Sequence, residues 1–192
     1  MSSFLRIAGA AALVLSLGLA ARALPVSIFA VADADIKALV HGDAVCAALN
    51  KLIVDARIVA KLQACLNVST IAELQIAIAA CVASLKVCAD ALLKLGAGVV
   101  VDAAAKADIV ACIAALITLI VKVCVQLSLK FGVSVVASLC AELDVCVRLL
   151  LANLDICITG IVALIVKAVL SVTVGLMAQV NLAACAKLFI GN

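Results

Sequence analysis

Residues 70–96 read TIAELQIAIAACVASLKVCADALLKLG, a run that contains no proline and has its only glycine at the end. Thr70 and Glu73 have the spacing of a capping box, in which the hydroxyl and the carboxylate each accept a hydrogen bond from a free backbone N–H. Gly96 is typical of a left-handed residue that ends a helix. The stretch therefore predicts one long helix that ends at about residue 95.

The polar side chains of this helix gather on one side. At about 100° per residue, Lys86, Asp90 and Lys94 follow one another along a charged ladder. Such pairs add only about 0.2–0.5 kcal/mol each, so the ladder marks a water-facing side more than it stabilises the helix. Cys81 and Cys88 fall on the opposite half, which predicts that the cysteines face inward.

Parts of this helix recur along the chain. Residues 84–101 and 120–137 have eight identical residues in eighteen aligned positions, and residues 112–122 resemble residues 157–167. The two offsets differ, so the chain is not a regular solenoid. We interpret the echoes as degenerate duplication of an amphipathic helix; chance similarity in a low-complexity chain is the alternative.

The later helices are expected to divide in the same way. Lys122 and Lys130 fall on a polar side of the echoed helix, with Cys124 opposite them. Glu142 and Asp144 are read as part of a water-facing side of the next helix.

Breakers are rare, because Pro25 is the only proline of the chain. We therefore predict an all-α fold, a disulfide-stapled bundle of four to five amphipathic helices. The expected helices cover about 33–66 (broken near Gly42), 70–95, 99 or 102 to 131, 133–152 (ending near Asn153), and 155–190 (broken near Gly175).

The chain is 69 % hydrophobic and 13 % charged. Soluble domains have about 45–50 % apolar residues and about 25 % charged residues. This chain is therefore either a membrane protein or a protein with an unusually large apolar core. Residues 1–23 have the basic start, apolar segment and small-x-small end of a signal peptide, with cleavage expected after Ala23. An uncleaved anchor is the alternative. Residues 24–192 are expected to form one helical domain, with a more polar half (24–108) and a more apolar half (109–192).

The cysteines all follow the expected cleavage point. An even number in a secreted chain predicts a disulfide framework, but ten cysteines allow too many pairings for any to be assigned. The ten are Cys46, Cys65, Cys81, Cys88, Cys112, Cys124, Cys140, Cys146, Cys157 and Cys185.

Other site chemistry is poorly supported by the sequence. No CxxC motif is present and His41 is the only histidine, which argues against a zinc site and against a catalytic triad. We expect no enzyme activity, no cofactor and no metal. Removal of Arg6 and Arg22 with the leader leaves 12 basic against 11 acidic side chains, too little charge to attract nucleic acid. Asn67 begins an Asn-Val-Ser sequon and is a candidate glycosylation site.

Residues 168–186 have no charge and approach the length of a membrane span. However, Lys86, Lys122 and Lys167 interrupt the apolar runs, and a lysine at mid-bilayer costs about 2.5–3.5 kcal/mol. A multi-span membrane protein is therefore kept as a second alternative.

Two other function classes fit the composition. One is a secreted, non-enzymatic structural or surface-active protein, acting at the cell wall or at hydrophobic interfaces, with apolar surfaces, wall polymers or itself as partners. The other is an extracellular helical carrier that binds lipid in an aliphatic cavity.

The chain also resembles a family in its layout. The leader ending ARALPV, the dispersed cysteines, the more polar first half and the Ala/Val/Leu-rich second half are similar to small secreted wall proteins of mushroom-forming basidiomycete fungi. The resemblance implies a role in aerial growth and attachment of hyphae. The chain differs from hydrophobins, which have eight cysteines including adjacent pairs, and no family residue can be carried over.

Overall fold

The computed structural model describes residues 36–169 and residue 182, and every regular element in this part is a helix. The all-α class predicted from the sequence is confirmed there. The elements are α3 (Ala44–Asn50), a π-helical segment η2 (Lys51–Asp55), α4 (Ile58–Asn67), α5 (Ile71–Leu95), α6 (Ala103–Phe131), α7 (Val133–Cys157) and α8 (Ile161–Ala168).

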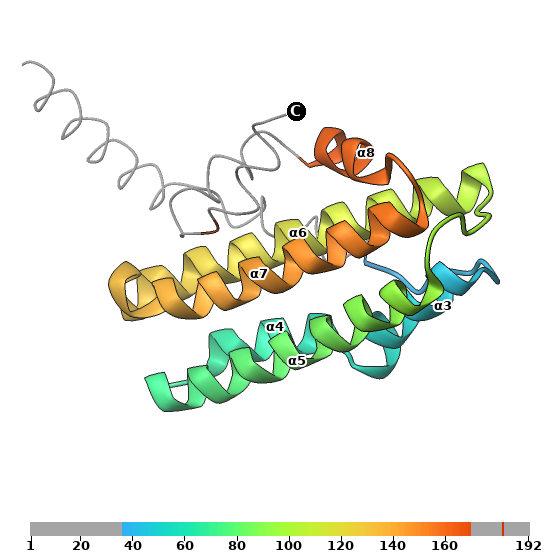
Figure 1. The fold of residues 1–192 in the computed structure, drawn as a ribbon. Coiled ribbons are helices and arrows are strands. Elements are labelled where there is room, and N and C mark those ends of the chain that lie inside the picture. Colours follow the sequence, from blue (N-terminus) through green and yellow to red (C-terminus); the bar gives the residue numbers. More distant parts are fainter. Residues whose placement is uncertain (1–35, 170–181, 183–192) are drawn as a thin grey trace, which may run out of the picture. The chain divides into compact units, whose positions relative to one another are not determined.

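The helices form two hairpins that pack into a bundle. In the first hairpin, α3, η2 and α4 together make one leg and α5 makes the other; in the second, α6 and α7 are the legs. α5 packs against α7, and α4 packs against α6. Figure 1 shows α5 and α7 running in the same direction. The short α8 folds back onto α6 and α7.

The predicted ends of α5 are confirmed. Thr70 Oγ1 accepts from the backbone N–H of Glu73 at 3.2 Å, and Glu73 Oε2 accepts from the N–H of Thr70 at 3.1 Å. The N–H of Ser69 also donates a hydrogen bond to Glu73 Oε2. These bonds stabilise the ionised form of the Glu73 carboxyl group and lower its pKa. Gly96 ends the helix at φ +72°, but its ψ of −166° is extended, so the expected left-handed helical cap is not formed.

α6 is the most deeply packed helix of the described part. It begins after Asp102, whose carboxylate accepts from the N–H of Ala105 at 2.7 Å, and ends at Gly132, as the sequence predicts. Both α5 and α6 are long and apolar enough to cross a membrane. However, 72 % of the most apolar stretch of α6 is buried inside the bundle, against 44 % for α5. The buried core helix of a soluble protein can have the same length and the same hydropathy.

The first expected helix, 33–66, is wrong in two places. Residues 36–42 are not helical, because Asp43 caps the N-terminus of α3 by accepting from the N–H of Cys46 at 2.8 Å. The helix is then interrupted at Arg57, which has φ +50°, not at Gly42. A left-handed arginine is unfavourable on its own, so its conformation depends on the packing of η2 and α4.

The expected end of the fourth helix near Asn153 is also wrong. Asn153 is buried, and its amide donates to the carbonyl of Ala89 on α5 at 2.8 Å. Because this bond ties α7 to its neighbour, the asparagine does not end the helix, which continues to Cys157. The next helix starts at Ile161 instead of near Asp155; its expected continuation beyond residue 169, with the break at Gly175, lies outside the described residues.

Two charged side chains are placed against expectation. Lys86, Asp90 and Lys94 are exposed, which confirms the water-facing side of α5. Lys122 and Asp144, in contrast, are buried. The reason is that α6 and α7 each pack against several other helices, so more than one side of each is buried. The sequence pattern of a single helix could not show which of its charged residues the neighbouring helices cover.

The Asn153 bond leads to a stability prediction. Asn153→Ala removes the donor to Ala89 and leaves a cavity between α5 and α7, so the free energy of unfolding should fall by about 1–3 kcal/mol. Gln75→Ala, on the exposed side of α5, is the matched control and should change it by less than about 0.5 kcal/mol. Urea unfolding followed by circular dichroism measures both; equal effects would show that the Asn153 bond does not hold the hairpins together.

Candidate functional site

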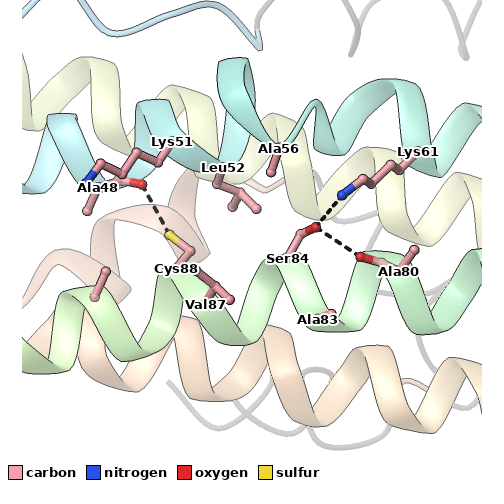
Figure 2. A pocket seen from close by; sticks show the side chains of 11 residues that line it. Ala48, Lys51, Leu52, Ala56, Lys61, Ala80, Ala83, Ser84, Val87 and Cys88 are labelled. Atoms are coloured by element: carbon pink, nitrogen blue, oxygen red, sulfur yellow. Dashed lines mark hydrogen bonds between the residues drawn. The ribbon is translucent and has the colours of Figure 1, made fainter.

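A groove runs between α5 and the leg made of α3, η2 and α4 (Figure 2). Its volume is about 420 Å³, which is within the usual range of about 300–1,000 Å³ for small-molecule sites. Ala80, Ala83 and Val87 line the α5 side, and Ala48 and Leu52 line the opposite side. The small side chains of alanine leave the space open, so the groove is a consequence of the alanine-rich sequence.

Two lysines bring charge to this apolar groove. Lys61 Nζ donates to Ser84 Oγ at 2.8 Å, and Ser84 Oγ donates in turn to the carbonyl of Ala80 at 2.9 Å. No ion pair between Lys61 and a carboxylate is found among residues 36–169. Lys51, on η2, lines the groove as well. The groove therefore has an aliphatic lining with positive charge, a combination that suits an aliphatic chain with an acidic head group.

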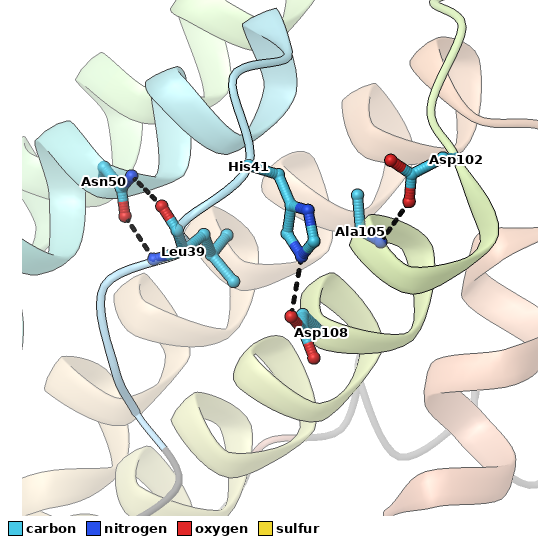
Figure 3. A network of polar contacts seen from close by, with 6 residues as sticks. All are labelled: Leu39, His41, Asn50, Asp102, Ala105 and Asp108. Carbon is cyan, nitrogen blue, oxygen red and sulfur yellow. Dashed lines mark hydrogen bonds and ion pairs between the residues drawn. The ribbon is translucent and has the colours of Figure 1, made fainter.

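The segment before α3 is held in place by two side chains (Figure 3). The amide of Asn50 accepts from the N–H of Leu39 and donates to its carbonyl, each at 2.7 Å. His41 Nε2 lies 2.8 Å from Asp108 Oδ2 on α6. The histidine thus forms a surface pair with Asp108 that fixes the segment to α6.

A line of apolar side chains is exposed along α5. Ile76, Ala80, Ala83 and Val87 follow one another at spacings of four, three and four residues, which puts them on one side of a helix. All four are exposed, Val87 to 68 %. We name these four residues the α5 stripe. It lies within the half of α5 that was predicted to face water, beside the charged ladder of Lys86, Asp90 and Lys94.

α7 has a second line with the same spacing. Val145, Leu149, Ala152 and Ile156 are all exposed, Val145 to 62 %. We name these four residues the α7 stripe. Neither stripe contains a charged residue. Single exposed apolar residues are ordinary, but four of them at helical spacing on each of two helices make an apolar line along the surface. The identical spacing was visible in the sequence and was missed.

The predicted inward position of the cysteines is confirmed for the nine that the structure describes, whereas Cys185 lies outside the described residues. All nine are buried and carry free thiols: Cys46, Cys65, Cys81, Cys88, Cys112, Cys124, Cys140, Cys146 and Cys157. The Sγ atoms of Cys65 and Cys81 are 4.0 Å apart, well beyond the roughly 2.05 Å of a disulfide bond. The helical class is thus established without the expected staples.

Two of the thiols, those of Cys88 and Cys112, ionise less readily than the thiols of reactive cysteines. Burial raises the pKa of Cys88 to about 12 and that of Cys112 to about 11, so both remain protonated at neutral pH. Among the described residues, no group of three or more His, Cys, Asp or Glu side chains could hold a metal ion. Asn67 is exposed at the end of α4, where a glycan could attach.

Comparisons with known proteins give no guide to the site, since no protein-family model, curated protein or solved structure matches the chain. Function has to be argued from the groove, the two stripes and the cysteines themselves.

The His41–Asp108 pair gives a prediction about pH. The hydrogen bond to Asp108 raises the pKa of His41 above its ordinary value of 6.5. The pair therefore stabilises the fold fully below about pH 6.5, and this contribution is lost as the pH rises through the raised pKa. Asp108→Asn should lower the pKa towards 6.5, and Asp90→Asn should not. Proton NMR of the single imidazole measures it; an unchanged pKa in Asp108→Asn would contradict the pairing.

Proposed function

We propose that this chain is a secreted, non-enzymatic helical protein that adsorbs to apolar surfaces through the α5 and α7 stripes. Such surfaces include air, wall polymers and other copies of the same chain, and the protein would act outside the cell or in the cell wall. The proposal extends the resemblance to basidiomycete wall proteins and rests on the chain's own residues. Disulfides would staple the bundle in that oxidising environment.

The observation that carries the proposal is the alignment of exposed apolar side chains. Each stripe covers about three helical turns. Large aliphatic side chains occupy two of the four positions in the α5 stripe and three of the four in the α7 stripe. Removing one such side chain from water is worth about 1.5–3 kcal/mol when burial is complete. Two stripes together supply enough energy to hold the protein at an apolar surface, while the charged ladder of α5 stays in water.

The stripes are tested by adding charge to them. The double variant Val87→Lys/Val145→Lys should bind a hydrophobic plate at least about tenfold more weakly, because a charge would have to lose its water at each stripe. The matched control is Val40→Lys/Val100→Lys, since these valines are 89 % and 91 % exposed but lie outside both stripes.

A quartz microbalance with an alkyl-coated sensor measures the adsorption, and circular dichroism checks that each variant is folded. Equal adsorption of the stripe and control variants, or no adsorption of the unmodified protein, would refute the proposal.

The groove favours a second candidate function, the carriage of a lipid with an acidic head group. The aliphatic chain would lie along Ala80, Ala83 and Val87, and the carboxylate would contact Lys61. This arrangement uses the apolar lining for affinity and one cation for orientation.

Ala83→Leu separates the two candidates, because it fills the groove and at the same time makes the α5 stripe more apolar. Binding of a long-chain fatty acid should fall several-fold if the groove is the site, whereas adsorption to the plate should hold or increase. Ala79→Leu is the control, since Ala79 is exposed on α5 but does not line the groove. Native mass spectrometry with oleic acid measures the first property; equal lipid binding by both variants would exclude the groove.

A further inference from the structure

Two cysteine pairs share a spacing that no other pair in the chain has. Cys65 and Cys81 are sixteen residues apart, and so are Cys124 and Cys140. The first pair joins α4 to α5 and the second joins α6 to α7, so each pair connects the two legs of one hairpin. In the second hairpin, Cys124 lies seven residues before the end of α6 at Phe131, and Cys140 lies seven residues after the start of α7 at Val133, so the antiparallel helices place the two cysteines at the same depth.

In the first pair, the Sγ atoms of Cys65 and Cys81 are 4.0 Å apart. In the second pair, Cys124 and Cys140 lie on helices that pack against each other, close enough for each thiol to change the pKa of the other. All four side chains are buried in the folded bundle, so exchange with a small disulfide takes place while the chain is still folding. Two thiols already in contact need only side-chain rotation and a small closure of the helices to reach bonding distance.

The two thiols of each pair influence each other's ionisation. The contact with Cys81 lowers the pKa of Cys65, and the neighbouring Cys124 lowers the pKa of Cys140. Since the thiolate is the nucleophile in disulfide exchange, a lowered pKa in one thiol of each pair favours the reaction.

We propose that Cys65–Cys81 and Cys124–Cys140 are two disulfides that staple the two hairpins separately. Each forms by exchange with a small disulfide such as oxidised glutathione. The first thiolate attacks the small disulfide and releases one glutathione thiolate; the second protein thiolate then attacks the mixed disulfide and releases the other. Each bond therefore consumes one oxidised glutathione and yields two molecules of the reduced form, with the protein dithiol as the reductant.

The remaining cysteines do not show the same arrangement. Cys46, Cys88 and Cys112 lie within electrostatic reach of one another, but three thiols cannot pair off among themselves. The inference assumes the secretion included in the proposed function, because a reducing compartment would keep both pairs open. Disulfide mapping on purified protein tests the pairing whether or not the protein adsorbs to surfaces.

The experiment refolds the reduced, deglycosylated chain in the presence of oxidised glutathione and alkylates the remaining free thiols in denaturant. The product is digested with trypsin without reduction, and the peptide masses are measured by mass spectrometry. Residues 62–86 form one tryptic peptide that contains Cys65 and Cys81 and no other cysteine. This peptide should be unalkylated and lighter by two hydrogen atoms. Residues 123–130 should appear linked to residues 131–148.

Cys146→Ser completes the design, because it leaves Cys140 as the only cysteine in residues 131–148 and should preserve both links. Cys81→Ser should leave Cys65 alkylated and the second link intact. The proposal is overturned if residues 62–86 carry two alkyl groups after oxidation, or if Cys65 or Cys140 is linked to any other cysteine. The map of the unmodified protein decides the first pair even if a variant fails to fold, and fragmentation of the linked peptide shows whether Cys140 or Cys146 carries the alkyl group.

Discussion

The structure depends on the burial of α6 between the remaining helices. Its apolar side chains meet α4 on one side and α7 on another, and α8 covers part of what is left. Because α6 takes up so much of the enclosed space, α5 and α7 have to present their outer faces to water. A chain with only 13 % charged residues cannot cover those faces with charge, and aligned apolar side chains remain exposed. The stripes are thus a consequence of the same composition that builds the core.

Features with a local cause could be predicted from the sequence. The starts of α5 and α6 depend on Thr70, Glu73 and Asp102, whose side chains bond to backbone groups only three residues away. Such contacts are encoded by the neighbouring residues. The inward position of Cys81, Cys88 and Cys124 also followed from helical periodicity, because these three fall opposite the charged side of their own helix.

Features with a distant partner could not be predicted in this way. Asn153 continues a helix because Ala89 is there to accept its hydrogen bond, and Lys122 is enclosed because other helices cover it. Arg57 interrupts the helix in the left-handed conformation, and nothing in the adjacent sequence predicts that conformation for an arginine. The groove belongs to the same class, since one of its sides comes from α3 and η2 and the other from α5. The contact between Cys65 and Cys81 likewise required knowledge of which helices are adjacent.

The central claim is that the α5 and α7 stripes are the part of the molecule that meets an apolar surface. Hydroxyl-radical footprinting tests this directly, by comparing side-chain labelling of the protein free in solution and bound to alkyl-coated particles. Labelling should fall at Val87 and Val145 on adsorption and should persist at Val40 and Val100, which are exposed outside the stripes. A uniform loss of labelling, or protection of Val40 and Val100 with the stripes still labelled, would contradict the claim.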